Sequence, residues 1–447
     1  MKKQLLTLFM SFALFAACSD DSSSTSAEKS KNNGGDVAEF HPFYRIDRDN
    51  VNEWQEPLDN QRYLTAGTYE LKAVDEKYDL DPAYAPSEEG LATLNISGSA
   101  QFSEQQFRDL ADSIRVLAGK KKVYVIDCRS ESHALVNGIA ISYFEQHNWG
   151  NQGLTLEEVE ADEQERFGKM VGTKQTFNEK DGESPGEAMT LKVKSIMMER
   201  ELVESEGFEY KRFVALNNHW QEPEMIDEFI EFVKGLDMDK VWLHFHCQAG
   251  KGRTAIFMVI YDMMKNPDVS MRDIVIRQAK AGGNYLLYTE KSDHYKSPLF
   301  DDIAEKVQLL YMYIQENRKS NYKVTWSEWL KKKVTTLTTT VPDAGSVTKD
   351  GNLNFDMSAK SFLKTFDYGD IVTVLVVGYG TVDVPVAAND DDVKSGEFVL
   401  RVKKDSDKIT LGIKNGNGAS VLGIGDKVHY PLSIVVRMKE KGGYANK

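Results

Sequence analysis

The hydrophobic and polar positions between residue 38 and about residue 335 follow two periods, one typical of strands and the other of helices. Short apolar runs predict buried strands, and apolar residues at helical spacing predict amphipathic helices. The expected strands are 123–126 and 242–245, and the expected helices are 107–117, 225–236 (after Pro223) and 254–264. Helices that alternate with strands in this way indicate an α/β domain over 38–335.

Two regions depart from this alternation. Between about 164 and 214 the chain becomes polar around NEKDGESPGE, and alternating segments at 190–196 and 208–214 predict a small β insertion. After about residue 338 the chain is rich in Thr and then in strand-like segments. The expected strands there are 371–377, 398–402, 409–413 and 432–438, with turn signals at Asn415-Gly416 and Asn417-Gly418. This predicts a separate all-β domain over 340–447.

The first residues have the pattern of an export signal. Lys2 and Lys3 precede an apolar run over 5–17, which is too short to span a membrane as a mature helix. Small residues precede Cys18, so residues 1–18 resemble a lipoprotein-type signal in which Cys18 is acylated. A polar stretch over 19–37 predicts a flexible linker. The expected location is the bacterial cell envelope, periplasmic or surface, with a lipid anchor in the membrane. An ordinary cleaved signal with an incidental cysteine is the alternative.

The overall charge limits the kinds of ligand that the protein can bind. With a net charge of -14, the chain is no general binder of nucleic acid, so an anionic ligand needs a local basic pocket. Apart from Cys18, only Cys128 and Cys247 remain, too few for a disulfide framework. Cys128 is either a redox partner of Cys247 or a buried strand cysteine.

Residues 246–254, HCQAGKGRT, have the composition and spacing of a phosphate-binding loop with a cysteine nucleophile. Two glycines let backbone N–H groups turn inward around an anion, and the following helix directs its positive end to the same point. That field favours a thiolate at Cys247, and Arg253 can bind two phosphoryl oxygens with its planar fork. The loop residues expected to line the phosphate site are His246, Gln248, Ala249, Gly250, Lys251 and Gly252.

The remaining positions of the loop are consistent with phosphate chemistry. Thr254 can hydrogen-bond the sulfur and help it leave an intermediate, while His246 can orient the loop from behind. A sulfurtransferase, the other enzyme class with a thiolate in such a loop, normally has one residue fewer between its Cys and Arg. The spacing therefore favours phosphate.

The chain also resembles the bacterial protein-tyrosine-phosphatase-like inositol polyphosphatases, or cysteine phytases, over roughly residues 90–335. The likeness includes NISGSAQFSEQQF at 95–107, the segment at 127–163 that begins DCRSESHALVNG, and IQENRKSNYKVTWSEWL at 314–330. It implies an α/β phosphatase (PTP-like) core with a small partial β-barrel and a basic pocket for inositol polyphosphates, and a reaction that uses no metal and no cofactor. It also implies phosphate-contacting groups at Arg129 and Lys296, with Lys280 as a further candidate.

The chain differs from this family at the general acid. The family has Asp-His in a loop before the helix that starts at Pro223, whereas this chain has Asn218 and His219. An amide cannot protonate a leaving group, and the loss of acid catalysis typically costs about 10²–10⁴-fold in rate. The candidates to replace the acid are His219 and Glu222. Glu222 has the alternative role of a charge that interacts with the helix dipole.

The sequence thus predicts a phosphomonoester hydrolase that acts through a phosphocysteine, most readily on inositol polyphosphates. Two alternatives remain open. One is a protein tyrosine or dual-specificity phosphatase. The other is a phosphate-binding pseudophosphatase, because Asn218 replaces the aspartate.

Overall fold

The structure of the chain is a computed structural model. It describes residues 40–47, 57–81, 83–290, 292, 294–332, 334–391, 393–425, 428 and 430–442. The predicted signal, Cys18 and the linker lie outside these residues, so the lipid anchor stays a prediction. Among the helices described, none is both long and apolar enough to cross a bilayer.

A five-stranded sheet lies at the centre of the α/β core, with the order β10-β4-β11-β3-β2. Its strands are β2 (Arg62–Leu64), β3 (Ile96–Ser99), β4 (Lys122–Asp127), β10 (Glu209–Arg212) and β11 (Val241–His246). All neighbouring pairs are parallel except β2 and β3. The carboxyl ends of β4 and β11 therefore meet at one edge, where His246 is the register partner of Asp127.

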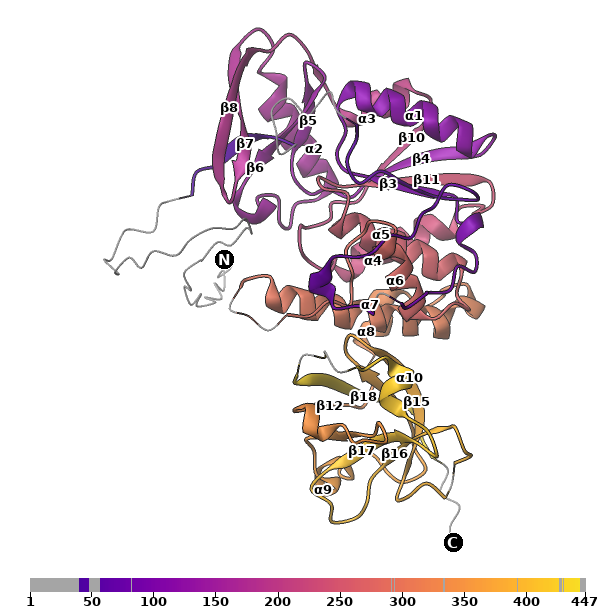
Figure 1. The fold of residues 1–447 in the computed structure, drawn as a ribbon. Coiled ribbons are helices and arrows are strands. Elements are labelled where there is room, and N and C mark those ends of the chain that lie inside the picture. The colour runs from indigo at the N-terminus through magenta and orange to yellow at the C-terminus, as the bar shows by residue number, and fades with distance from the viewer. Residues whose placement is uncertain are drawn as a thin grey trace, which may run out of the picture.

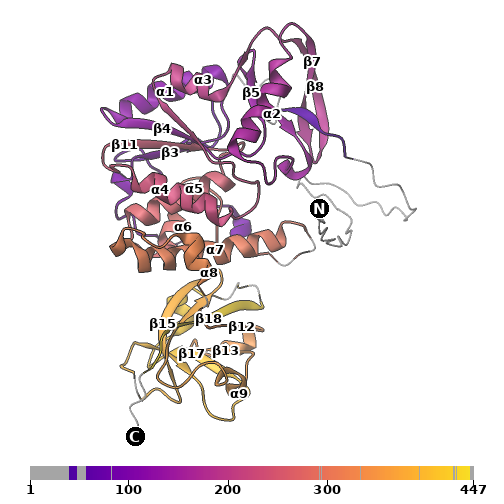
Figure 2. The same cartoon turned by 180° about the vertical axis from the view of Figure 1, so that it is seen from behind.

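Helices cover both faces of this sheet (Figures 1 and 2). On one face lie α1 (Glu104–Ala118) and α3 (Glu199–Ser205), with Phe107 and Leu202 in the core beneath them. The other face is covered by a larger group of helices, whose core includes Phe245 and Phe257. These helices are α4 (Pro223–Lys234), α5 (Gly252–Lys265), α6 (Met271–Lys280), α7 (Ser297–Asn317) and α8 (Trp326–Lys331). The α/β core and the strands and helices expected at its centre are confirmed.

A second sheet of six strands lies beside this core, in the order β8-β7-β1-β6-β5-β9. Its strands are β1 (Phe43–Ile46), β5 (His133–Val136), β6 (Ile139–Phe144), β7 (Lys174–Asp181), β8 (Ser184–Lys192) and β9 (Ile196–Met197), and α2 (Leu156–Gly168) packs against it through Phe167. The expected insertion at 164–214 has the wrong bounds. The sheet recruits β1, β5 and β6 from outside that range, while β10, inside it, belongs to the central sheet.

The C-terminal part forms a seven-stranded, nearly closed sheet in the order β12-β18-β14-β15-β16-β17-β13. Its strands are β12 (Thr336–Val341), β13 (Leu353–Phe355), β14 (Ile371–Val376), β15 (Gly380–Ala387), β16 (Phe398–Arg401), β17 (Ile409–Ile413) and β18 (Leu432–Glu440). A hydrophobic core that includes Val374, Leu411 and Ile434 fills it. Two short helices, α9 (Ala359–Phe362) and α10 (Gly418–Leu422), accompany these strands. Asn417-Gly418 is therefore a helix start and not a hairpin turn, because the Asn417 side chain accepts from Ser420 N–H.

Candidate active site

The loop between β11 and α5 is held from outside by hydrogen bonds to its carbonyl groups. The carbonyl of Gln248 accepts from the Gln101 N–H at 3.0 Å. Those of Ala249 and Gly250 accept from Asn60 at 2.9 Å and from Arg62 at 2.8 Å. With these carbonyls engaged from outside, the N–H groups of the loop are available to an anion inside it, as the sequence predicts.

Gly250 is a requirement of this conformation. Its φ is +70°, and a Cβ at this position would lie 2.3 Å from the carbonyl carbon of Ser99. The loop can therefore approach β3 so closely only because this residue has no side chain. A substitution here would displace the loop that carries the nucleophile.

The Cys247 thiol lies at the end of β11, almost completely buried. Burial by itself raises its pKa, but the positive charge of Arg253 and hydrogen bonds from the hydroxyl and the N–H of Thr254 lower it. The net effect is a pKa below the ordinary cysteine value, which favours the nucleophilic thiolate. The roles expected for Arg253 and Thr254 agree with this geometry.

The second cysteine is close to the first and has the opposite chemistry. The Cys128 N–H donates to the carbonyl of His246 at 3.0 Å, so Cys128 follows the strand beside that of Cys247. Burial, together with the charge of Cys247, raises the Cys128 pKa well above its ordinary value. Cys128 thus remains a protonated thiol, and both cysteines are free.

Arg253 is held by a buried carboxylate that the sequence analysis did not identify. Glu131 forms two hydrogen bonds with the guanidinium, one of 2.9 Å, and both side chains are 3% exposed. Burial raises the pKa of Glu131, but the charges of Arg253 and Arg129 hold it well below its usual range. The carboxylate fixes the Arg253 fork in one orientation, and a bidentate grip on phosphate requires this.

A cavity of about 240 Å³ opens above the nucleophile. Its cationic side chains are Lys77, Lys251 and Arg253, and no carboxylate lines it within the described residues. The other lining residues are Tyr78, Asn217, Asn218, His219, Cys247, Gln248, Ala249, Gly252, Ile256, Asn284, Tyr285, Leu286, Tyr288, Phe300 and Ile303. This is the local basic pocket that an anionic ligand needs in a protein of net negative charge.

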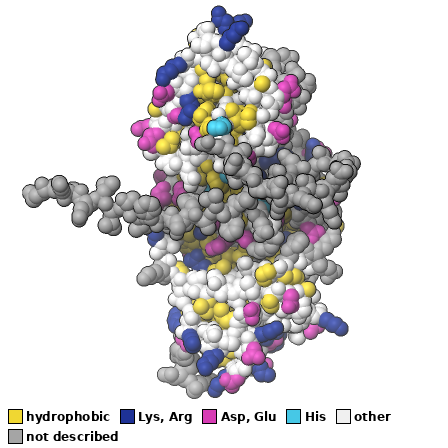
Figure 3. Space-filling view, turned by 90° about the vertical axis from the view of Figure 1, so that its left-hand side faces the viewer, with side chains coloured by type: hydrophobic (Ala, Val, Ile, Leu, Met, Phe, Trp, Pro, Cys, Tyr) yellow, Lys and Arg dark blue, Asp and Glu magenta, His cyan; other side chains and the backbone are white. Residues whose placement is uncertain are grey.

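Acidic and basic side chains are interspersed on the outer face of the C-terminal sheet, at the bottom of Figure 3. That face therefore shows no continuous basic surface. Within the described chain, positively charged side chains surround the nucleophile Cys247 in the cavity and its loop.

The site for the general acid lies in the loop at 216–221. Asn218 has φ +61°, and both it and His219 line the cavity. The His219 Nδ1 lies 2.9 Å from the carbonyl of Asn217, which makes Nδ1 the donor and leaves Nε2 as the other ring nitrogen. The Trp149 indole N–H donates to the same carbonyl at 2.9 Å, and its ring packs edge-on against His219 at 4.9 Å.

The predicted site residues that lie outside the cavity include Arg129, Lys296 and Glu222. The side chain of Arg129 is fully buried and pairs with Asp47 at 2.9 Å, and it does not line the cavity as the expected role requires. Lys296 lies at the start of α7 with its ammonium near the Tyr295 ring, and it does not line the cavity. Glu222 is exposed at the start of α4, away from the cavity.

The histidine before the nucleophile supports the loop from behind. The buried side chain of His246 packs against Phe102, with ring centroids 4.9 Å apart, and its Nε2 lies 2.8 Å from Glu199. Its side chain does not line the cavity, whereas Lys251 and Gly252 do. The supporting role expected for His246 fits this position, and direct phosphate contact by its side chain does not.

Behind the loop lies a group with the spacing of metal ligands, namely Asp127, His133 and Glu199. Arg212 contacts Asp127 at 3.0 Å, and His133 contacts Glu199 at 3.2 Å. Because cations of the protein already balance these acids, the group acts as a buried ion network that supports the loop.

Two further residues at the site, Arg62 and Tyr78, were not predicted from the sequence. Arg62 reaches the loop from β2, and burial lowers its pKa to about 10 while the charge of Cys247 opposes this shift. Tyr78 forms part of the cavity wall. Neither lies in a motif, since both reach the site from segments about 170 to 185 residues before the loop.

A family model described as PTP-like phytase, inositol hexakisphosphate, matches residues 126–265. The structure of a tandemly repeated protein tyrosine phosphatase-like phytase from Mitsuokella multacida is 35% identical and covers 67% of this chain, with a TM-score of 0.60. A PTP-like myo-inositol phosphatase from the same organism, in complex with myo-inositol-(1,3,4,5)-tetrakisphosphate, is 35% identical and covers 66% of this chain, with a TM-score of 0.58.

Among curated sequences, the effector protein hopD2 of Pseudomonas syringae pv. tomato is 29% identical over 250 residues, which are 54% of this chain. The chain spans about half the length of these relatives, namely 50% of each Mitsuokella chain and 53% of the effector.

Proposed function

Because this chain belongs to the PTP-like phytase family, we propose that it is a cysteine-dependent phosphatase that hydrolyses inositol phosphates. The thiolate of Cys247 attacks phosphorus, and the bond from phosphorus to the leaving oxygen breaks. The leaving oxygen takes a proton from an acid of the enzyme. Water then attacks the phosphocysteine, releases inorganic phosphate and restores the thiolate.

The observation that carries this proposal is the position of Cys247 in a cavity lined by cations and by no carboxylate of the described chain. Arg253, which Glu131 holds in place, can bind two equatorial oxygens as charge develops on them. Lys77 and Lys251 add positive charge on the walls, which suits a substrate with several phosphate groups.

We propose His219 as the general acid in place of the aspartate that the family has. It lines the cavity, whereas Glu222 does not. Because Nδ1–H donates to the carbonyl of Asn217, the proton given to the leaving oxygen is the Nε2 proton of the imidazolium form. Trp149 positions this loop through the same carbonyl.

A second function follows from Asn218. Without a working acid, the site would bind phosphorylated ligands and turn them over poorly, as a pseudophosphatase does. Aryl phosphates would then be favoured among substrates, because phenolate leaving groups need little protonation.

The C-terminal sheet has its own hydrophobic core, separate from that of the α/β part. The predicted start of this part at residue 340 is wrong, because it falls inside β12. We propose that the chain from β12 onward is a separate domain, with a task other than the chemistry at Cys247.

The test is phosphate release from inositol hexakisphosphate, a phosphotyrosine peptide and p-nitrophenyl phosphate, each beside Cys247→Ser. We expect release from inositol hexakisphosphate and none from the variant. Release from the peptide alone would make the protein a tyrosine phosphatase. Tight binding of inositol hexakisphosphate with no release from any substrate would make it a pseudophosphatase.

A further inference from the structure

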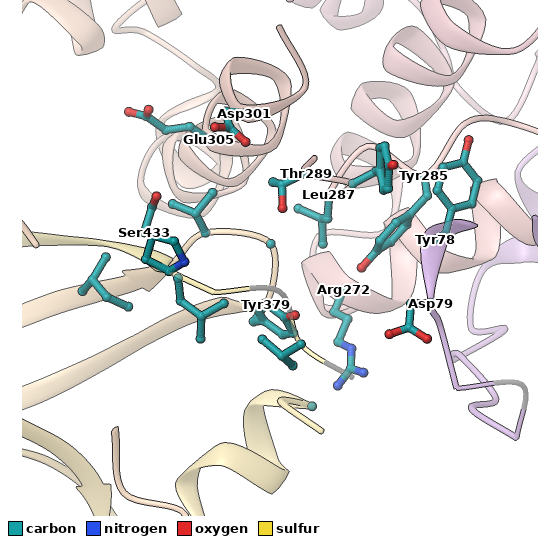
Figure 4. A pocket seen from close by; sticks show the side chains of 18 of the residues that line it. Tyr78, Asp79, Arg272, Tyr285, Leu287, Thr289, Asp301, Glu305, Tyr379 and Ser433 are labelled. Atoms are coloured by element: carbon teal, nitrogen blue, oxygen red, sulfur yellow. The ribbon is translucent and has the colours of Figure 1, made fainter. Parts of the chain in front are cut away.

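A second cavity, of about 770 Å³, lies between the phosphatase core and the C-terminal sheet (Figure 4). It adjoins the cavity above Cys247, which is called the phosphate cavity from here on. The two cavities share Lys77, Tyr78, Tyr285 and Tyr288 as lining residues. Its volume lies in the range of sites that bind small organic molecules.

The two parts of the chain that form this cavity are in direct contact with each other. The guanidinium of Arg272, on α6, lies so close to Gly423 that a Cβ there would be 2.0 Å from Nη1. The guanidinium of Arg437, on β18, lies 4.5 Å from the ring centroid of Trp329, on α8. These contacts join the core to the C-terminal sheet, so the cavity is a defined space within the fold.

The cavity is polar at its ends and aromatic in its middle. Asp301 and Glu305, one turn apart on α7, lie at one end, and Arg272 with Asp79 lies at the other. Between them lie Tyr285, Leu287 and Tyr379, with Thr289 nearby (Figure 4). Rigid aromatic and apolar side chains beside carboxylates suit a ligand that carries a positive charge on an apolar body.

Glu305 gives this end of the cavity its negative charge. No hydrogen bond or ion pair engages it within the described chain. Burial lowers the pKa of Arg437, and the charges of Glu316 and Glu305 act in the opposite direction, but Arg437 and Glu305 form no ion pair. Asp81 at the rim adds a fourth carboxylate, against two cations, Lys77 and Arg272.

We propose that this cavity is a second ligand site, for a small organic ammonium compound with an apolar or aromatic body. The ammonium group interacts with the carboxylates of Glu305 and Asp301, and the body packs against Leu287, Tyr285 and Tyr379. Polyphosphates are excluded, since four carboxylates line the site. The site is thus distinct from the proposed catalytic one.

Three probes that share a phenyl group and differ in charge test this proposal: phenethylammonium, phenethyl alcohol and phenylacetate. Binding is measured by calorimetry and ligand-observed NMR on the full chain carrying Cys247→Ser, so the result does not depend on catalysis. Because a hydrogen bond to a charged group is the stronger kind, we expect the ammonium probe to bind at least about tenfold more tightly than the alcohol, and phenylacetate to bind least.

Glu305→Gln should remove most of that preference, while Asp302→Asn, an exposed change on the same helix outside the cavity, should leave it intact. Ser433→Trp, which places a large ring in the cavity from β18, should weaken binding of every probe. Equal binding of the three probes, no binding of any, or equal effects of the two helix variants would each overturn the proposal. Circular dichroism and retained affinity for inorganic phosphate would show that the variants are folded.

Discussion

The two neighbouring cavities share a wall of tyrosines but have opposite electrostatic character. Among the residues that the structure describes, three cationic side chains and no carboxylate line the phosphate cavity, whereas four carboxylates and two cations line the second. The difference comes from the elements that complete each one. Loop and α5 residues around Cys247 complete the first, and α7 with the C-terminal sheet completes the second.

This contrast shows how one chain with a net charge of -14 can bind an anion. Arg253 remains positive and oriented because Glu131 lies behind it, on the side away from the cavity. In the second cavity, the acidic groups of α7 themselves line the space. The electrostatic character of each cavity therefore depends on the position of its carboxylates. They lie behind the wall of the phosphate cavity, whereas they line the second cavity.

The largest expected effect concerns proton donation in the phosphate cavity. We expect His219→Asn to lower kcat on inositol hexakisphosphate by about 10²–10⁴-fold and to change p-nitrophenyl phosphate hydrolysis far less. Glu222→Gln, outside the cavity, is the matched control and should change neither rate. Asn218→Asp should raise the rate on the inositol phosphate. If Glu222→Gln lowers that rate and His219→Asn does not, Glu222 is the acid.

The next largest expected effect is on kcat/KM, in variants of one arginine from each cavity. Arg253→Lys keeps the charge but loses the bidentate fork, so we expect kcat/KM to fall by about 10²–10³-fold. Arg272→Lys, in the second cavity, should leave kcat/KM within about twofold of the wild type. Steady-state phosphate release measures both, and equal losses would show that the two cavities do not act separately.

A third prediction concerns acid stability. The pKa of Glu131 is lower in the folded protein than in the unfolded chain, so its contribution to stability is present above about pH 5 and is lost as pH falls. We expect Glu131→Gln to cost about 3 kcal/mol in unfolding free energy at pH 7 and to flatten the loss of stability in acid. Urea unfolding at several pH values measures this, and an unchanged acid profile would assign the pH dependence to other groups.

The smallest expected effect separates the two cysteines. Because the pKa of Cys247 is lowered and that of Cys128 is raised, alkylation near pH 7 should modify Cys247 at least about tenfold faster. As the pH falls, the alkylation rate of Cys247 should decline only at pH values below the ordinary pKa of a cysteine thiol. Mass spectrometry after iodoacetamide treatment gives both rates, with inorganic phosphate as a competitor. Comparable rates would contradict the assignment of Cys247 as the thiolate.

Local patterns predicted the central elements because each is complete within a short segment. The stretch from β11 through the loop to α5 contains an apolar strand, two glycines and an apolar helix in sequence order. The six-stranded sheet was bounded wrongly because its pairing between β1 and β6 joins residues about a hundred positions apart. No periodicity within either strand specifies that partner.

The sequence by itself determined which loop is expected to bind phosphate, which thiol and arginine it carries, and that Asn218 stands where the related family has its acid. Only the tertiary structure decided that Arg129 is a buried ion-pair partner, that Glu131 orients Arg253, and that a second cavity adjoins the first. The physical reason is that a charged side chain acts according to its burial and its neighbours. Both are fixed only when distant segments pack together, such as those of Glu131 and Arg253, which are 122 residues apart.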